Sequence, residues 1–560
     1  MHYGGIEHNI ISSLDRAISA VSAGLNSHPK PLQKFKVELE APKGESHGDL
    51  STNIAMKIAR EMGQEPYSLA NLIKEQLETG SRTSRLKEVV ERIETKPPGF
   101  INFFLSRNYL CEVLLEIERK KDCFGRSGIG RGARLQVEFV SANPTGPLTI
   151  AHGRQAAIGD SLANILDFVG YNVTREYYMN DLGTQMDILA NSIRIRYLES
   201  CGVSEIFPED GYKGSYIMDI AKAFNRKFGR KYIKTKNLKL FREFGLSWIL
   251  NDIKKDLKDF GVRFDVWYSE SSLRKSGKVE NAVRLLKKRG YIYEKDKAIW
   301  FKSQAFGDDK DRVVFKSDGS PTYLAPDIAY HLDKYRRGFK RIIDIWGPDH
   351  HGYIPRIRAA VKALGYSDDS MSVLIVQLAT LIRGGEAVSM STRAGEYVTL
   401  RQVMDEVGKD VARFCFLMRR LSSHLDFDLD AVKVESQENP VYYIQYAHAR
   451  IWSLLEHARK AKLSTKLDSR LLKESEELEL LRTLRRFPNA VSLSADNLEP
   501  YIILQYLQDL ATTFHSFYTK HKVVSDDLNL SKARLVLVDC VRIVLANGLC
   551  LLGVSLPKKM

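Results

Sequence analysis

The sequence predicts a multidomain protein with an α+β N-terminal domain, a Rossmann-like α/β domain with a parallel sheet and an insertion, and an all-α C-terminal domain. Three observations support this. The 560 residues are too many for a single hydrophobic core. A strand, a sharp turn and a helix follow one another over residues 134–160. The apolar spacing is helical from about residue 410 onward. We place the domains at 1–122, 123–409 and 410–560, with the insertion at about 190–310.

The composition is that of an ordinary folded protein, with 44% hydrophobic and 27% charged residues. The 84 Lys and Arg exceed the 69 Asp and Glu by 15, which modestly favours a polyanionic partner. The six cysteines form no CxxC pair, so we expect neither a zinc site nor disulfides. The start of the chain lacks a signal peptide, and we find no apolar stretch of about 20 residues. We therefore expect a cytoplasmic protein with no membrane association.

The N-terminal domain shows both helical and strand periodicity. Two helices are expected around residues 10–21 and 69–77, and one strand at Phe35–Leu39. Val89–Ile93 and Phe100–Leu105 flank Pro97-Pro98-Gly99 as a hairpin. For His47 and Asp49 we favour a turn that enters a helix over a direct chemical role.

The central stretch is Arg134–Asp160. Leu135–Val140 alternates as a strand does, Asn143–Pro147 is rich in turn residues, and Gly153–Leu166 has helical spacing. A helix entered in this way points free backbone N–H groups beyond the strand tips, where phosphates bind in α/β folds. The glycines of residues 123–132 precede the strand, so they form a linker and not a dinucleotide fingerprint.

Further strands are expected around this unit. One ends at Asp181, and the other half of the sheet is expected at Arg312–Phe315 and Arg341–Trp346. The insertion should contain a helix over residues 246–257 and a strand over 262–266. The motif Asp349-His350-His351 follows a buried strand, but adjacent residues do not converge easily on one ion, and no metal site is predicted.

Several segments of the chain resemble sequence motifs of known enzymes. NPTGPLTIAHGR is similar to the nucleotide-binding signature of class I aminoacyl-tRNA synthetases, and VEFVSANPTGP with REYYMNDLGTQM resembles the arginyl-tRNA synthetase family. HGDLSTNIAM, PPGFINFFL, SPTYLAPDIAYH, IIDIWGPDHHGY and NPVYYIQYAHARI match the same family. The resemblance implies ATP-dependent attachment of L-arginine to tRNA through an arginyl-adenylate, with Mg²⁺ accompanying ATP. It also implies an N-terminal domain that touches the tRNA elbow and a helical anticodon-binding domain. A monomer is expected.

The resemblance implies three sets of site residues. The ATP site would comprise Pro144, Thr145, Gly146, Pro147, Thr149, His152, Gly153, Asp349, His350, Met390 and Ser391, with His152, Ser391 and Arg393 acting in catalysis. The arginine site would comprise Glu138, Ser141, Asn143, Glu270, Tyr323, Asp327 and Gln377. Tyr442, Tyr446 and His448 would stack on anticodon bases, although aromatic residues at helical spacing are more often core.

An arginine substrate makes a specific physical demand. Its guanidinium is planar and always charged, so a selective pocket needs carboxylate and oxygen acceptors in a fixed arrangement. Asp327 with Tyr323 four residues earlier, and Glu270 beside them, would supply such acceptors. The structural alternatives are a core tyrosine, a helix-capping Asp327 and a solvated Glu270.

Both family signatures are altered in this chain. Ser389 and Thr392 stand where the second signature usually has lysines, and Thr149 and Ala151 replace a histidine and a glycine of the first. Lost cationic donors weaken charge stabilisation in a transition state. The nearest candidates to replace them in sequence are Arg154, Arg383 and Arg393. The alternative is a synthetase-like paralogue that binds tRNA without catalysis, but an RNA binder has no need of an arginine pocket.

Overall fold

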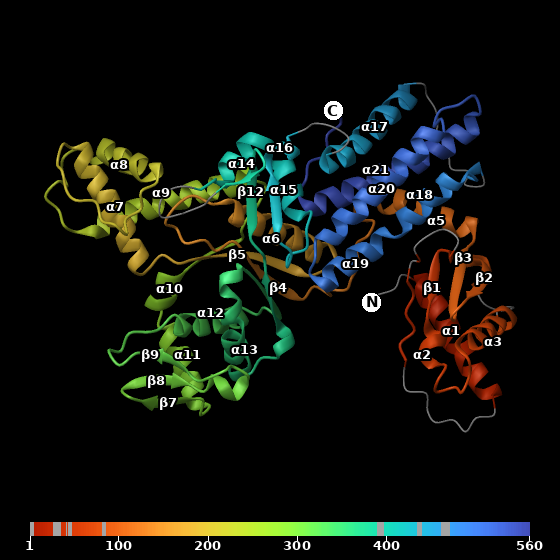
Figure 1. The fold of residues 1–560 in the computed structure, drawn as a ribbon, viewed down its shortest axis with the longest axis horizontal. Coiled ribbons are helices and arrows are strands. Elements are labelled where there is room, and N and C mark those ends of the chain that lie inside the picture. Colours follow the sequence, from red (N-terminus) through yellow and green to blue (C-terminus); the bar gives the residue numbers. More distant parts are fainter. Residues whose placement is uncertain are drawn as a thin grey trace.

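The computed structural model describes residues 5–25, 35–40, 42, 47–80, 86–388, 397–433, 439–460 and 471–559 (Figure 1). It has the predicted multidomain architecture. An α+β N-terminal domain and a helical C-terminal domain lie on one side of a central α/β domain, and a helical arm projects from the other side (Figure 1).

The N-terminal domain packs helices on a three-stranded antiparallel sheet of order β1-β3-β2. Its elements are α1 (Gly5–Gly24), β1 (Leu50–Thr52), α2 (Ile54–Ile58), α3 (Pro66–Gly80), α4 (Leu86–Val89), β2 (Val90–Lys96) and β3 (Phe100–Leu105). The predicted hairpin is confirmed as β2 and β3. The strand predicted at Phe35–Leu39 is wrong. Val37 and Leu39 are buried in alternation, but the chain joins the sheet only through an isolated bridge between Glu40 and Ser51.

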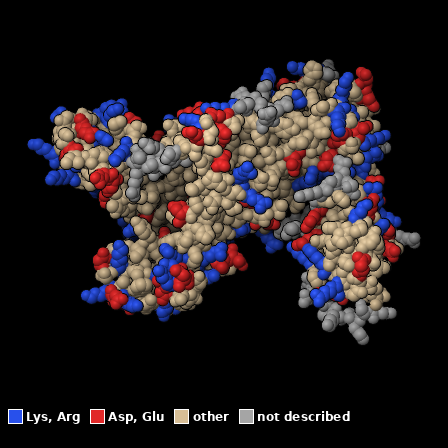
Figure 2. All heavy atoms as spheres, viewed as in Figure 1, with Lys and Arg blue, Asp and Glu red and all other residues tan. Residues whose placement is uncertain are grey.

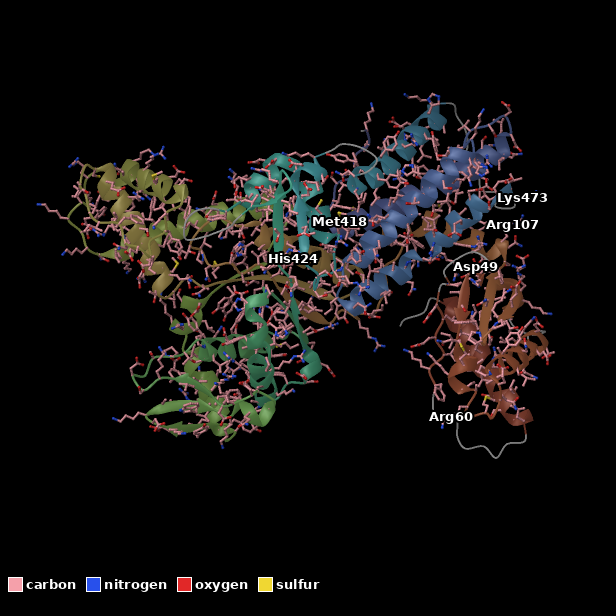
Figure 3. All side chains as sticks on the ribbon, viewed as in Figure 1. Asp49, Arg60, Arg107, Met418, His424 and Lys473 are labelled. Atoms are coloured by element: carbon pink, nitrogen blue, oxygen red, sulfur yellow. The ribbon has the colours of Figure 1, made fainter. Side chains whose placement is uncertain are left out.

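Asp49 joins the N-terminal domain to the helical domain. It precedes β1 and caps no helix, so the predicted helix-entry turn is wrong at this residue. Its carboxylate accepts a hydrogen bond from the Leu105 backbone N–H at 2.7 Å and pairs with Arg482 at 2.5 Å. Figure 3 shows Asp49 at the edge of the N-terminal domain that faces the helices. Helix α5 (Arg107–Lys120) and the turn η3 (Lys121–Cys123) then lead into the central domain.

The central domain contains a parallel sheet of order β11-β10-β4-β5-β6. Its strands are β4 (Arg134–Glu138), β5 (Asn172–Met179), β6 (Val266–Ser269), β10 (Arg341–Trp346) and β11 (Met371–Ile375). Helix α6 (Ile150–Phe168) is buried on almost every face, because it lies between this sheet and the C-terminal helices. Strand β6 lies inside the range predicted as insertion and forms an edge of the sheet.

The placement of Arg312–Phe315 in the main sheet is wrong. This segment is β9, which pairs antiparallel with β8 in a separate sheet of order β7-β8-β9, because the β7–β8 hairpin immediately before it offers an open edge. The surrounding elements are α10 (Glu270–Lys275), α11 (Lys278–Lys288), β7 (Ile292–Lys295), β8 (Ala298–Phe301), η4 (Ser303–Phe306), α12 (Leu324–Arg336), η5 (Pro348–Tyr353), α13 (Ile354–Ala363) and η6 (Asp368–Ser370). The arm consists of α7 (Thr184–Ser200), α8 (Ser215–Phe228) and α9 (Leu238–Asp259).

A small sheet of order β13-β12-β14 connects the central and helical domains. This region comprises β12 (Ala379–Arg383), β13 (Glu386–Ala387), α14 (Leu400–Val407), α15 (Lys409–Leu417), β14 (Leu425–Asp428) and α16 (Leu429–Val432). The chain is then helical: α17 (Pro440–Lys460), α18 (Ser475–Arg485), α19 (Phe487–Asn497), α20 (Tyr501–Lys520) and α21 (Leu528–Leu552).

Helix α21 is apolar enough to cross a membrane by length and composition, with a mean hydropathy of 2.2 over its most apolar window. The expectation that the sequence lacks such a stretch is therefore wrong. However, 72% of that window is buried, with α17, α18 and α20 packed around it. Its apolar character is that of a core helix.

Candidate active site

The turn between β4 and α6 lies beyond the carboxyl edge of the parallel sheet. Val140 and Ser141 have φ angles of 67° and 39°, in the left-handed region that a β-branched residue rarely occupies. Such strain persists only where the surroundings impose it, and it is concentrated at functional sites. Here the turn is held from the arm, because the Tyr216 hydroxyl donates a hydrogen bond to the Thr145 carbonyl at 2.7 Å. A side chain at Gly146 would lie 3.1 Å from that hydroxyl.

His152 lies in the first turn of α6 and closes a capping box with Thr149. The Thr149 backbone N–H donates to Nδ1 of His152 at 3.1 Å. Burial lowers the pKa of His152 to about 4, and the nearby Asp349 carboxylate offsets only part of this shift. The ring is therefore neutral at pH 7 with its proton on Nε2, so it can offer one N–H donor to a phosphate oxygen.

Two residues predicted to bind ATP make close structural contacts. A Cβ at Gly153 would lie 2.7 Å from the Leu400 side chain, and its backbone N–H is bound to the Thr149 carbonyl. Gly153 therefore allows α6 to pack closely against Leu400. Thr149 is only 8% exposed and bridges to Thr399.

The second signature, including Ser389, Met390, Ser391, Thr392 and Arg393, lies outside the described residues. The chain that follows it returns beside the first signature, because the Leu400 N–H donates to the Leu148 carbonyl at 2.8 Å. Arg383, which precedes the signature, pairs with Glu406 at 2.7 Å.

Arg154 cannot replace a missing lysine, contrary to the expectation from its position in the sequence. Its side chain is fully buried, and its guanidinium donates to four backbone carbonyls, those of Gln377, Leu378, Arg420 and Ser423, at 2.8–3.2 Å. The guanidinium thus fixes α6 against the segments that follow β11 and α15. Gln377, predicted to bind arginine, is positioned by this contact.

Asp327 is the centre of the predicted arginine pocket. Burial raises the pKa of Asp327 to about 6, the charges of Glu270 and Glu138 add to the rise, and a hydrogen bond from Tyr353 opposes it. The Tyr353 hydroxyl lies 2.7 Å from Oδ2 of Asp327. Tyr323, predicted to act with Asp327, is 79% exposed, so the hydroxyl that reaches this carboxylate comes from Tyr353.

Glu270 is not a solvated loop acid. It is 5% exposed, begins α10, and pairs with Arg274 at 2.5 Å. Burial raises the pKa of the Tyr178 hydroxyl, and the charges of Glu270, Asp327 and Glu138 add to the rise. The structure therefore brings three predicted acids together around one tyrosine, which is an environment suited to a cationic side chain.

A cluster of tyrosines lines the same region and was missed from the sequence. Tyr178 on β5, Tyr268 on β6 and Tyr330 on α12 have ring centroids 4.6–6.2 Å apart. Each belongs to a different element, so no spacing in the chain indicates the cluster. Aromatic faces attract guanidinium and ammonium groups.

Beneath the pocket, three acids stand side by side on neighbouring strands. Glu138 on β4 is in register with Glu176 on β5 and with Asp344 on β10. Lys334 of α12, which is fully buried, donates to Glu138 at 2.6 Å and to Asp344 at 2.7 Å. Arg337 pairs with Glu176 at 2.5 Å. Burial raises the pKa of Glu138, and Lys334 opposes that rise.

The remaining predicted residues of the arginine site lie at the rim of the turn. The Ser141 hydroxyl donates to Glu138 at 3.1 Å and accepts from the Tyr178 N–H at 3.1 Å. Asn143 is exposed and donates to Gln185 of α7 at 2.9 Å. Asp349 and His350 are exposed after β10, and the influence of Asp349 on His152 places this loop opposite the start of α6.

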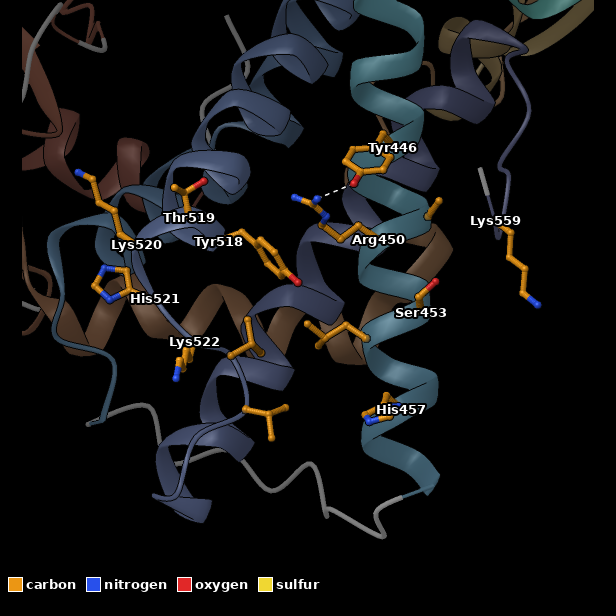
Figure 4. A pocket seen from close by; sticks show the side chains of 14 residues that line it. Tyr446, Arg450, Ser453, His457, Tyr518, Thr519, Lys520, His521, Lys522 and Lys559 are labelled. Carbon is orange, nitrogen blue, oxygen red and sulfur yellow. Dashed lines mark hydrogen bonds between the residues drawn. The ribbon is translucent and has the colours of Figure 1, made fainter. Parts of the chain in front are cut away.

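The predicted anticodon contacts divide into two groups. His448 is 3% exposed, and its Nδ1 lies 3.0 Å from the Pro557 carbonyl, so its prediction as a base-stacking residue is wrong. Tyr446 instead lines an open hollow of about 960 Å³ between α17 and the end of α20 (Figure 4). The hollow also contains Arg450, Tyr518, Lys520, Lys522 and Lys559. Tyr442 is half-buried.

In the parts of the chain that the structure describes, no group of three or more His, Cys, Asp or Glu side chains is arranged to hold a metal ion.

Three family models match the chain in order. They are described as "Arginyl tRNA synthetase N terminal domain" over residues 8–105, "tRNA synthetases class I (R), catalytic domain" over 126–416 and "DALR anticodon binding domain" over 444–560. A protein of Geobacillus kaustophilus named arginine–tRNA ligase is 49% identical over 97% of both chains. One of Desulforamulus reducens with the same name is 46% identical over 99% of this chain and 100% of its own. The Thermus thermophilus arginyl-tRNA synthetase structure has the same fold, with a TM-score of 0.75, 21% identity, and coverage of 98% of this chain and all of its own.

Proposed function

The chain belongs to the arginyl-tRNA synthetase family, and from this membership we propose how its crevice attaches L-arginine to tRNA at the expense of ATP. The protein is an arginine–tRNA ligase. The observation that supports the assignment of the amino acid is the half-buried Asp327 beside Glu270, held by Tyr353 in a pocket walled by tyrosines. A carboxylate fixed in this way meets the geometric demand of a guanidinium.

In the first displacement, the carboxylate of arginine attacks the α-phosphorus of MgATP. An O–P bond forms as the bond to the β-phosphate oxygen breaks, and pyrophosphate leaves with the electron pair. The guanidinium pairs with Asp327, and Ser141, Asn143 and Gln377 hold the α-amino and α-carboxylate groups. The neutral His152 donates its Nε2–H to the triphosphate, and it is not a base. Such chemistry depends mainly on positioning and charge neutralisation.

In the second displacement, a ribose hydroxyl of the terminal adenosine of tRNA attacks the carbonyl carbon of the arginyl-adenylate. The ester bond forms, AMP leaves with the electrons of the anhydride bond, and the hydroxyl proton passes to a phosphate oxygen of the departing AMP. The hollow beside Tyr446 is proposed to receive anticodon bases, with Arg450 and Lys520 near their phosphates. We also propose the domain limits 1–122, 123–409 and 410–560, and a cytoplasmic monomer.

The assignment is tested by charging tRNA with radiolabelled arginine, ATP and Mg²⁺, with lysine as the rival substrate. We expect arginine to be attached and lysine to be rejected by a factor of at least about 10³, because a point charge does not satisfy a fork-shaped site. Absence of charging together with intact tRNA binding would instead support a non-catalytic paralogue.

His152 makes a prediction about pH. Because its pKa is near 4, the ring is neutral throughout the range pH 6–8, and its titration should not shape the rate in that range. His152→Ala should lower kcat by roughly 10²-fold through loss of one donor to the phosphates. The profile of log kcat for the variant should run parallel to that of the wild-type enzyme from pH 6 to 8. An inflection near pH 6.5 that disappears in the variant would contradict this reading.

A further inference from the structure

The outer end of the arm has an unusual concentration of positive charge. Residues 222–242 contain nine Lys and Arg and no Asp or Glu. These nine, which we call the arm cations, are Lys222, Arg226, Lys227, Arg230, Lys231, Lys234, Lys236, Lys239 and Arg242. All except Arg242 are exposed. Figure 2 shows blue side chains extending from this end of the molecule.

Most of this charge is not neutralised by the protein. Lys239 lies 4.0 Å from Glu243, and Arg242 pairs with Asp187. The other seven arm cations form no ion pair with any residue that the structure describes. Seven uncompensated charges within one helical hairpin produce a strong local field, which favours a polyanion over a small acidic ligand.

An exposed aromatic side chain lies among these cations. Trp248 of α9 is 39% exposed and separates two hollows. The larger, of about 910 Å³, is lined by Lys222 and Arg226, and the smaller, of about 310 Å³, by Lys227 and Phe244. Trp248 is supported from behind by Phe244, with ring centroids 6.4 Å apart and planes inclined by 27°. A supported, exposed indole flanked by cations is the arrangement on which unpaired bases stack.

The base of the arm contacts the catalytic crevice. Tyr216, in the first turn of α8, donates to the Thr145 carbonyl in the signature turn, and Gln185 of α7 accepts from Asn143. The arm lies on the opposite side of the central domain from the N-terminal and helical domains (Figure 1). A polyanion bound along the arm therefore leads directly to the crevice, and the polyanion that must enter this crevice is the acceptor strand of tRNA.

We propose that the arm cations and Trp248 form a binding surface for the acceptor strand of tRNA, with phosphates paired to Lys222, Arg226 and Lys227 and an unpaired base stacked on Trp248. The identity of the RNA rests on the tRNA-charging function, whereas the surface itself rests on the arm. Charging by the wild-type enzyme therefore tests the function, and the binding experiments below test the surface.

The first experiment neutralises three cations in the full-length enzyme, as Lys222→Gln, Arg226→Gln and Lys227→Gln together. The Kd for tRNA, measured by fluorescence anisotropy at several salt concentrations, should rise about tenfold or more at 0.15 M salt, and the slope of log Kd against log salt should fall by about 2–3. The KM for tRNA should rise in parallel, while the Kd for arginine should not change. The matched control is Arg284→Gln with Lys287→Gln and Lys288→Gln on α11, which is also exposed and should bind as the wild type does.

The second experiment separates stacking from charge and locates the contact. Trp248→Ala should weaken tRNA binding about tenfold, and Trp248→Phe should restore most of the affinity. With a tRNA shortened by its unpaired 3′ nucleotides, the effect of Trp248→Ala should disappear. Unchanged Kd and salt slope in the triple variant would overturn the proposal. Loss of binding to phosphatidylserine vesicles with unchanged tRNA binding would also overturn it and would assign the arm to a membrane surface.

Discussion

Asp327→Asn is expected to lower kcat/KM for arginine by about 10²–10³-fold, which corresponds to about 3–4 kcal/mol. The amide keeps the shape of the side chain and the contact with Tyr353, but it replaces a charged acceptor by a neutral one opposite a guanidinium that cannot lose its proton. Selectivity against lysine should fall with it. The measurement is steady-state charging with each amino acid at saturating tRNA and ATP.

The same residue sets an expected pH dependence of arginine binding. The pKa of Asp327 is about 6 in the free enzyme, and only its ionised form can pair with arginine. The Kd for arginine should therefore be constant above pH 7 and rise about tenfold for each unit below pH 6. Since arginine stabilises the ionised form, binding at pH 6 should release protons, which calorimetry in buffers of different ionisation enthalpy detects.

A matched control is available for both experiments. Asp296→Asn makes the same change at an exposed residue in the β7–β8 turn, where φ is 53° and asparagine is as well suited as aspartate. It should leave charging and arginine affinity unchanged. If Asp327→Asn also kept the wild-type selectivity and pH dependence, the guanidinium would have to lie elsewhere, and Glu270 would become the principal acceptor.

The sequence predicted those features that depend on residues close together in the chain. His152 at the start of α6 and Asp349 after β10 both lie where periodicity and turn residues placed the elements. The assignment of Phe35–Leu39 as a strand failed for a physical reason. Alternating burial shows only that one face of the segment is covered. A strand also needs hydrogen-bonded pairing along its length, and within the described residues 35–40 only Glu40 is bridged to the sheet.

The remaining features depend on distances between residues that are far apart in the chain. Tyr353 is 26 positions from the carboxylate it contacts, and Arg154 reaches carbonyls more than 220 positions away. Nothing in the spacing of Arg154 distinguishes a phosphate-binding cation from a buried structural one, and only its four carbonyl contacts decide the matter. The run of cations at residues 222–242 is a local feature, but its meaning required the position of Trp248 and the base of the arm.

Lys334→Met is expected to destabilise the central domain by about 3–5 kcal/mol. The side chain is fully buried between Glu138 and Asp344, and methionine fills the same volume while leaving both carboxylates without their cation. Amide hydrogen exchange in β4 and β10 measures the loss locally, which avoids treating a multidomain chain as a two-state folder. Lys340→Met, an exposed lysine six residues later, should change stability by less than about 0.5 kcal/mol.

The destabilisation caused by Lys334→Met should depend on pH, and it should decrease as the pH falls. Burial alone would raise the pKa of Asp344, but Lys334 and His331 lower it to about 2, below its ordinary value of 3.8. A depressed acid contributes stability that is present above pH 3.8 and lost as the pH falls toward 2. The variant lacks the contribution from Lys334, so its loss of stability relative to the wild type should be largest above pH 4 and should shrink in acid.

Adding Asp344→Asn to Lys334→Met should restore part of the lost stability, because one unpaired buried charge is removed. A variant as stable as the wild type at pH 7 would mean that Glu138 and Asp344 are already protonated in the native enzyme, and that the row of acids beneath the arginine pocket carries less charge than the geometry implies.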